Sequence, residues 1–355
     1  MFEFKIFNEL DGECEYFWKK LEQHSINDYF QTYDYHKELI TNYNIKSLNI
    51  VIIFYNNEPV ALFPFFIKKY FFLKVLQFIG TKYSDYCNPL INIEFDKKLD
   101  KKIFNNLWNN IIKNIENFDL FFLNNQFKNI KNFKNPLVYY LDSIKFSNIF
   151  RINLLENFDL YKKNIFKIDK DHHYEIHRTL LKKKKLEKNF KLVFEIENLE
   201  NTDLKLERLI ETKIKTFLNR KKRINLDIKF ANVFKNLSEK NSKTFFVSTL
   251  KVNGEIISAC FSIYFKDVFY YFIPVIFSRK FDKYKIGKIL ILDLIDWCIK
   301  KNFKIFDFGL GAEKYKKYFS NSSLDLFRYF YFNSFKGFIL YLFLKVVSRL
   351  GIKQF

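Results

Sequence analysis

The stretch of sequence that decides the fold is residues 244–319, TFFVSTLKVNGEIISACFSIYFKDVFYYFIPVIFSRKFDKYKIGKILILDLIDWCIKKNFKIFDFGLGAEKYKKYF. Residues 244–276 contain successive runs of β-branched and aromatic residues, with breaks at Val252–Gly254 and Lys266–Asp267. Short turn-forming breaks between such runs predict consecutive antiparallel strands joined by tight turns. We therefore expect three antiparallel strands in this part of the chain.

A polar loop with Gly287 and an amphipathic helix follow these strands. Apolar side chains recur along the helix at Ile291, Leu294, Ile295 and Cys298. Their i, i+3, i+4, i+7 spacing predicts a helix over residues 288–301 with one apolar face. The segment KIFDFG, residues 304–309, then predicts a short strand.

The sequence upstream contains the same kinds of segment. Residues 170–243 predict a strongly basic helix, a strand at 191–197 and two further helices. In the first half of the chain we expect a helical region over 14–43, a β-hairpin turning at Asn56 and Asn57, a helix over 98–116 and a strand over 119–125. Residues 151–159 are expected to form a connection, with a domain boundary near residue 150.

The composition excludes a disordered chain and leaves the meaning of its charge open. Hydrophobic residues make up 48% of the 355 residues, and aromatic residues make up 20%, which is too apolar for disorder. The formal net charge of +21 suggests nucleic acid, an anionic membrane surface or a phosphorylated substrate as partner. AT-rich coding DNA would produce the same excess of Lys, Asn, Ile, Phe and Tyr without any selection for function.

Several features bear on location and on metal chemistry. The acidic residues near the start do not fit a secretion signal, so we expect a cytoplasmic protein. The apolar run Phe338–Leu344 is too short to span a bilayer. With basic residues around it, among them Lys353, the tail could lie on an anionic membrane at its inner face or pack on the protein.

No metal site is expected, because the cysteines are scattered and because His173 and His177 lack a third ligand in sequence.

The order of strands, loop with glycine, helix and strand ending in IFDFGLGAEKYKKYF resembles the core of GNAT-type acyltransferases. The branch it resembles includes CelD-like acetyltransferases and Fem-type aminoacyltransferases. In the first half, FQTYDYHKEL, EPVALFPFF and SDYCNPL are similar to segments of the same proteins. The resemblance implies an α+β (mixed α/β) fold of two GNAT-like lobes, each with a mostly antiparallel mixed sheet flanked by helices: residues 1–150, residues 151–335, and a basic amphipathic helix over 336–355.

The resemblance also implies an activity: transfer of an acetyl or other acyl group from acyl-CoA to an amine or hydroxyl. The acceptor would be a sugar or another cell-envelope precursor, as in CelD-like and Fem-type proteins. Ile286 stands where relatives often have proline, and Fem-type relatives take their acyl group from aminoacyl-tRNA, so a tRNA donor is the first alternative. A basic, aromatic, non-catalytic protein that binds nucleic acid or a membrane is the second.

Donor binding is expected around the loop before the helix. Gly287 at the head of a helix allows backbone N–H groups to approach a phosphate, and the helix dipole favours an anion there. Lys285, Lys288 and Tyr284 lie beside it in sequence, and Lys283 adds a further charge. The alternative is that Gly287 makes an ordinary turn.

Catalysis is expected at Asp307, Tyr315 and Lys316, the residues that match the family pattern. Tyr315 would give a proton to the leaving group, and Lys316 would stabilise negative charge on the carbonyl. Asp307 would serve as an acid or base, but a structural carboxylate at the Gly309–Gly311 turn is the favoured alternative. Lys316 could equally belong to a solvated basic face.

Acceptor binding is expected at Asp85, Tyr86 and Arg178. Asp85 and Tyr86 belong to the SDY turn in the first half of the chain, where a purely turn-forming role is the alternative. Arg178 belongs to the basic run that continues through Lys182–Lys185, which could bind an anionic group or could simply be a solvated helix face.

Overall fold

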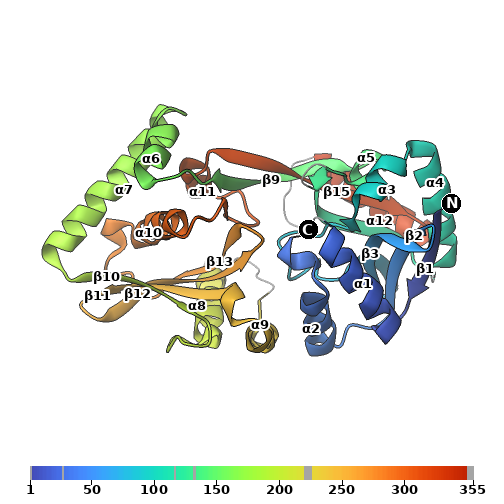
Figure 1. Cartoon of the computed structure of the whole chain (residues 1–355), viewed down its shortest axis with the longest axis horizontal. Coiled ribbons are helices and arrows are strands. Elements are labelled where there is room, and N and C mark those ends of the chain that lie inside the picture. The colour runs from blue at the N-terminus through green and yellow to red at the C-terminus, as the bar shows by residue number, and fades with distance from the viewer. Residues whose placement is uncertain (1, 26–27, 116, 131–132, 220–225, 350–355) are drawn as a thin grey trace. The chain divides into compact units, whose positions relative to one another are not determined.

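The computed structural model describes residues 2–25, 28–115, 117–130, 133–219 and 226–349 (Figure 1). The chain forms two compact units. Unit 1 comprises residues 1–147 and 325–355, and unit 2 comprises residues 148–324. Residues 325–335, which the sequence analysis gives to the second domain, therefore pack in unit 1. Lys353 of the expected C-terminal helix lies outside the described residues.

Unit 1 is built on a mixed sheet with the strand order β1-β2-β3-β4-β6-β15. Its strands are β1 (Phe2–Phe7), β2 (Leu48–Tyr55), β3 (Glu58–Tyr70), β4 (Leu73–Phe78), β5 (Leu90–Ile91), β6 (Leu120–Phe127) and β15 (Ser322–Phe332). β4 and β6 are parallel, and the other neighbours are antiparallel, with β5 added beside β3. The short strands β7 (Asn129–Ile130) and β8 (Phe133–Lys134) form a separate hairpin.

Helices cover both faces of the unit 1 sheet. They are α1 (Gly12–His24), η1 (Tyr29–Gln31), α2 (Tyr33–Tyr43), α3 (Ile93–Lys98), α4 (Lys101–Asn114), α5 (Pro136–Tyr139) and α12 (Phe335–Arg349). α1 and α2 pack through Trp18 and Tyr33, and α4 packs on the opposite face through Phe104 and Trp108. The helical region predicted over 14–43 is interrupted, because Ser25 is extended and Asp28 caps a new turn.

Unit 2 has a sheet with the strand order β9-β14-β13-β12-β11-β10. The strands are β9 (Ile144–Asn153), β10 (Leu192–Asn198), β11 (Phe245–Val252), β12 (Glu255–Phe265), β13 (Val268–Ile276) and β14 (Ile305–Asp307). β13 and β14 are parallel and the others antiparallel, so the three predicted antiparallel strands, β11 to β13, are confirmed. The prediction of a connection from residue 151 is wrong for Arg151–Asn153, because these residues pair with β14.

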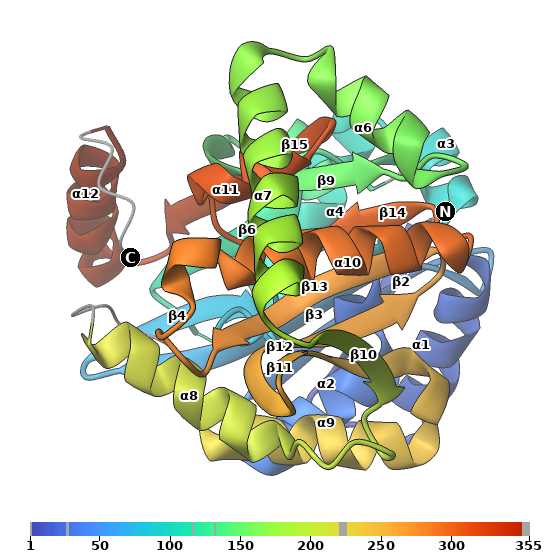
Figure 2. The ribbon, with the colours of Figure 1, turned by 90° about the vertical axis from the view of Figure 1, so that its left-hand side faces the viewer.

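The helices of unit 2 also form two layers. They are α6 (Phe158–Phe166), α7 (Lys170–Asn189), α8 (Leu206–Asn219), α9 (Ile228–Lys240), η2 (Ser242–Thr244), η3 (Asp282–Tyr284), α10 (Ile286–Lys300) and α11 (Lys314–Phe319). α10 packs on one face of the sheet with α7 lying across it (Figure 2). α8 and α9 pack on the other face, where Phe230 contacts Phe272, and Phe234 contacts Phe245 and Phe261.

The two units share one order of elements. Each contains a first strand, two helices, three antiparallel strands, a helix, and a strand parallel to the last of the three. The next strand in each sheet comes from the other half of the chain: β15 pairs with β6, whereas β9 pairs with β14. The sequence contains no repeat clear enough to predict this duplication. Among the described helices, none combines the length and the apolarity needed to cross a bilayer.

Candidate active site

The candidate site of unit 2 lies where two parallel strands part. β13 and β14 pair only from Val268 with Ile305 to Tyr270 with Asp307, after which β14 ends and β13 continues to Ile276. The pairing of β12 with β13 shifts register between Phe261 and Ser262, at a β-bulge. Bulges are common beside functional sites because they redirect side chains. The fold therefore opens a wedge after Tyr270, and α11 follows it.

Asp307 is fully buried and fixes the loop that leaves the sheet. Its Oδ2 accepts a hydrogen bond from Arg151 Nε at 2.6 Å, and its Oδ1 accepts one from the backbone N–H of Gly309 at 2.7 Å. Gly309 has a φ of +67° and Gly311 one of +108°, backbone angles that favour glycine. A carboxylate held on both oxygens ties β14, β9 and the turn together, which is the structural role that the sequence analysis favours.

Lys316 is also buried, and it holds the far end of this loop. Its Nζ donates to Leu310 O at 2.7 Å and lies 3.0 Å from Glu313 Oε2. A Cβ on Gly311 would lie 2.6 Å from Glu313 Oε2, so a larger residue there would displace this carboxylate. Burial raises the pKa of Glu313, but the Lys316 ammonium outweighs it, and the net pKa is lowered.

Tyr315 precedes Lys316 on α11 and is partly buried against the core of unit 2. Burial raises its pKa, and the Glu313 carboxylate raises it further. The phenol is therefore protonated at neutral pH and can only donate or accept a hydrogen bond. No described residue makes a hydrogen bond with its hydroxyl.

Two residues that the sequence analysis does not identify lie close to this group. Lys213 on α8 donates to Pro274 O at 2.9 Å and interacts electrostatically with Glu313 and Cys260. Burial raises the pKa of Cys260 to about 12, so its thiol is protonated and is a poor nucleophile at neutral pH. Neither could be found from spacing, because Lys213 and Cys260 both lie far from Glu313 in the sequence.

The start of α10 has the character of an anion-binding helix end. Its N-cap residue, Lys285, has a φ of +58° and makes no capping hydrogen bond through its side chain. Lys285 Nζ lies 3.0 Å from Glu175 Oε1, and Lys288 Nζ contacts the same oxygen. Burial raises the pKa of Glu175, but the two lysines outweigh it and lower the pKa overall. Two ammonium groups against one carboxylate leave a net positive charge at this helix end.

The remaining predicted donor residues differ in their surroundings. Gly287 is the second residue of α10, and a Cβ there would meet Ile276 Cδ1 at 3.5 Å, an ordinary contact. The structure therefore does not require glycine at this position for packing. Tyr284 is buried and packs edge-on against Phe190, so its side chain belongs to the core.

The predicted acceptor residues are not brought together within one unit. Tyr86 is fully buried in unit 1, where its ring contacts Phe30 and Phe127, so its side chain belongs to the core. Asp85 beside it is partly exposed. In unit 2, Arg178 is exposed on α7, with its guanidinium 5.6 Å from the Tyr174 ring.

The histidines of α7 do not form a metal site within the described residues. The rings of His173 and His177 stack at 5.8 Å between centroids. Over the described part of the chain, no group of three or more His, Cys, Asp or Glu side chains could hold a metal ion.

Comparison with known proteins supports the resemblance. Residues 177–317 match the family model described as an acetyltransferase (GNAT) domain. The crystal structure of FemX is similar over 99% of this chain and 100% of that one, at 10% identity and a TM-score of 0.57. L-PGS from Bacillus licheniformis is similar over 99% of each chain, at 12% identity and a TM-score of 0.51.

A third similar structure is the C-terminal domain of a protein assigned as a lysylphosphatidylglycerol synthetase from Agrobacterium fabrum. It covers 94% of this chain and 96% of that one, at 8% identity and a TM-score of 0.52. No match was found among curated proteins. The predicted mixed α/β fold of GNAT-like lobes is confirmed, and the residues that match the GNAT acetyltransferase model, 177–317, lie within unit 2.

Proposed function

We propose that unit 2 transfers an acyl group from acyl-CoA to an amine or hydroxyl of a sugar or another cell-envelope precursor. The observation that carries this proposal is the parting of β13 and β14 in front of the uncapped N-terminus of α10. The match of residues 177–317 to a GNAT acetyltransferase domain supports it.

The donor would bind along this wedge. A diphosphate at the start of α10 would accept hydrogen bonds from the N–H groups of Ile286 and Gly287, and Lys285 and Lys288 would offset its charge. Glu175 would position these two ammonium groups. The amide-containing arm of coenzyme A would lie along the part of β13 that runs on beyond Asp307, where strand backbone is available for hydrogen bonding.

In the reaction the acceptor nitrogen or oxygen attacks the thioester carbonyl and gives up its own proton to water. The carbon–sulfur bond breaks, the thiolate takes up a proton from a protein side chain, and water then restores the proton to that side chain. Tyr315 is the proposed donor of that proton, because its raised pKa keeps it protonated. Lys316 and Asp307 are positioning residues that hold the Gly309–Gly311 loop. The direct attack needs no nucleophile from the protein, which agrees with the inert thiol of Cys260.

The acceptor class is suggested by the similar structures. FemX and the lysylphosphatidylglycerol synthetase domain point to cell-envelope or lipid-related acceptors. Arg178 on α7 and Asp85 in unit 1 are the accessible acceptor-binding candidates. Such acceptors would be met at the cytoplasmic side of the membrane, where the protein would make peripheral contact.

A second candidate function is aminoacyl transfer from charged tRNA. The observation that favours it is the basic surface of α7, where Lys182, Lys184 and Lys185 follow Arg178, combined with the similarity to FemX. The same transfer chemistry would then use an ester in place of a thioester.

Calorimetric titration with acetyl-CoA tests the donor. We expect saturable binding to the wild-type chain and loss of binding in Gly287→Glu, whose carboxylate would occupy the proposed phosphate position. Gly12→Glu is the matched control, because Gly12 begins α1 and a Cβ there meets nothing within 4 Å. Absence of binding at millimolar acetyl-CoA, together with binding of charged tRNA, would overturn the acyl-CoA proposal in favour of the tRNA donor.

A further inference from the structure

α12 has two apolar faces, one packed on the sheet of unit 1 and one largely exposed. Apolar side chains that are largely exposed lie along its outer side: Phe335, Ile339, Leu342, Phe343 and Val346. Phe335 is 77% exposed and Ile339 60%. At 3.6 residues per turn these positions form one continuous stripe. We call this stripe the outer face.

The opposite side of α12 packs on the sheet of unit 1 and attaches the helix to it. Leu344 is buried against Val75, Leu120 and Phe330 of the unit 1 sheet. A Cβ on Gly337 would lie 1.8 Å from Asp119 O, so the helix backbone lies directly on the start of β6. Packing within unit 1 therefore explains the inner side of α12, whereas the outer face adds exposed apolar surface.

The turn between β3 and β4 shows the same excess of exposed apolar surface. Phe71 is 103% exposed and Phe72 is 73% exposed, and Phe71 has a φ of +52°. The other hairpin turns place Asn56–Asn57, Asn253–Gly254 and Lys266–Asp267 at such positions. A bulky residue in left-handed backbone costs stability, as does exposing its ring to water, and such local costs are typical of functional surfaces.

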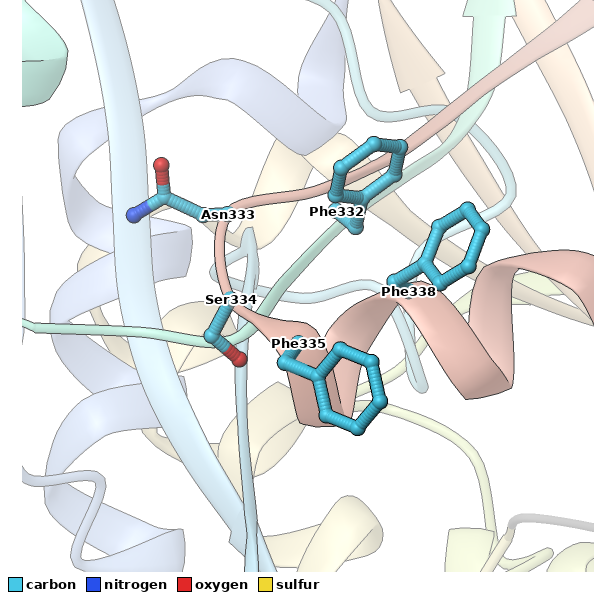
Figure 3. A pocket seen from close by; sticks show the side chains of 5 residues that line it. All are labelled: Phe332, Asn333, Ser334, Phe335 and Phe338. Carbon is cyan, nitrogen blue, oxygen red and sulfur yellow. The ribbon is translucent and has the colours of Figure 1, made fainter.

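Asp119 holds the two features together. Its Oδ2 accepts from the N–H of Lys74 at 2.8 Å, just after the Phe71–Phe72 turn. Its Oδ1 accepts from Ser334 Oγ at 2.5 Å, just before α12. A shallow hollow of about 540 Å³ opens here, lined by Phe332, Asn333, Ser334, Phe335 and Phe338 (Figure 3). In Figure 3 the three phenylalanine rings lie around one end of α12.

The charges carried by the Phe71–Phe72 hairpin and by α12 themselves have one sign, whereas the carboxylate of Asp119 between them is held by hydrogen bonds. Lys336 and Lys345 lie on either side of the outer face, and Lys68, Lys69 and Lys74 flank the Phe71–Phe72 turn. Residues 59–78 and 335–349 contain no acidic residue. Exposed apolar side chains between lysines are the pattern of a helix that lies in the interface of an anionic bilayer, with rings in the acyl region and ammonium groups at the phosphates.

We propose that the outer face of α12 and the Phe71–Phe72 turn together form the surface by which this protein binds an anionic lipid bilayer. The proposal does not depend on the acyl donor or acceptor, because bilayer binding is measured without catalysis. It would bring the enzyme to precursors that are themselves attached to the membrane.

Vesicle sedimentation with the full chain tests this surface. We expect binding to vesicles of phosphatidylglycerol and phosphatidylcholine, weak binding to pure phosphatidylcholine, and weakening by salt. Ile339→Glu with Phe343→Glu, or Phe71→Asn with Phe72→Ser, should each reduce binding by at least about tenfold, since each removes inserted apolar surface. All four side chains are exposed, so these variants should unfold at the wild-type temperature by circular dichroism.

Leu218→Glu is the matched control, an exposed leucine on α8 of unit 2 that should leave vesicle binding unchanged. Three results would overturn the proposal: no binding of the wild-type chain to anionic vesicles, binding that survives both double variants, or a dimer in light scattering that the α12 variant dissolves while vesicle binding is absent. The last would assign the outer face to a second copy of the chain.

Discussion

Unit 1 and unit 2 each have an arginine on the strand that comes from the other half of the chain, but the two arginines have different partners. In unit 2, Arg151 on β9 donates to the carboxylate of Asp307 at the end of β14. In unit 1, Arg328 on β15 donates to the amide oxygen of Asn124 on β6 at 2.8 Å, and its guanidinium lies over the rings of Phe122 and Phe146. No described carboxylate forms an ion pair with Arg328, and burial lowers its pKa to about 10.

The helices that precede the second parallel strand of each unit, α4 and α10, also differ, in how their N-terminal ends are capped. α4 of unit 1 begins with Asp100, whose carboxylate accepts from the N–H of Ile103 at 2.7 Å and so occupies the helix end. α10 of unit 2 begins with Lys285 and no side-chain cap. The bulge beside Ser262 in β12 and β13 has no counterpart between β3 and β4, whose register is continuous. One scaffold can thus be closed by capping in one copy and left open to an anion in the other.

The largest expected effect comes from removing the carboxylate that distinguishes the two arginines. Asp307→Ala leaves the Arg151 guanidinium largely buried without its partner and should cost about 3–5 kcal/mol of unfolding free energy. Acyl transfer should be lost with it. Asn124→Ala, the counterpart in unit 1, removes one hydrogen bond to a charged donor and should cost about 1.5–3 kcal/mol while activity remains. Urea denaturation and an activity assay compare the two, and equal losses of activity would remove the distinction between the units.

Tyr315→Phe should reduce kcat by about 10²-fold or more, since a general acid typically contributes this much. Tyr329→Phe in unit 1, where burial also raises the pKa of the tyrosine, should leave kcat unchanged.

The active form of Tyr315 is the protonated one, and the pKa of Tyr315 is raised. The wild-type rate should therefore show no loss due to this group between pH 7 and about 10, the ordinary tyrosine pKa. A loss of activity that follows a group titrating near pH 7 and disappears in Tyr315→Phe would contradict this role.

The residues that distinguish unit 2 from unit 1 were only partly predictable from the sequence. Local patterns gave the three antiparallel strands, α10 and β14, because each depends on the periodicity of its own side chains. The exchange of β9 and β15 was not predicted, since a strand's partner is set by residues far away in sequence. Asp307 and Lys316 were identified from a resemblance, but Arg151 lies 156 residues from Asp307, and Glu175 lies 110 residues from Lys285. No spacing rule reaches that far.

Gly337 and Gly287 both lie near the start of a helix, but only Gly337 is expected to be required for packing. Gly337→Ala would place a Cβ against the backbone oxygen of Asp119 and should cost about 1–3 kcal/mol through displacement of α12. Gly287→Ala makes only an ordinary contact with Ile276 and should change stability by less than about 1 kcal/mol. Thermal unfolding of both variants checks this order, and a larger loss in Gly287→Ala would mean that its glycine is structural.

The smallest expected effect comes from making unit 1 resemble unit 2. Asn124→Asp would give Arg328 a carboxylate partner and should add about 1 kcal/mol to the unfolding free energy at pH 7. The paired carboxylate would have a folded pKa below its unfolded value of about 4, so the gain should be present above that pH and lost as pH falls below it. Urea denaturation at pH 7 and pH 3 measures the difference from wild type. A gain that persists at pH 3 would show that the charge pair is not its source.

We expect the donor to bind in unit 2 and not at the corresponding strands and helix of unit 1. Hydrogen–deuterium exchange of the wild-type chain with and without acetyl-CoA tests it directly, because slowed exchange locates the contact. We predict protection at residues 284–290 and along β13, with β4 and the start of α4 unchanged. Protection confined to β4 and α4 would contradict the account and would move the chemistry to unit 1.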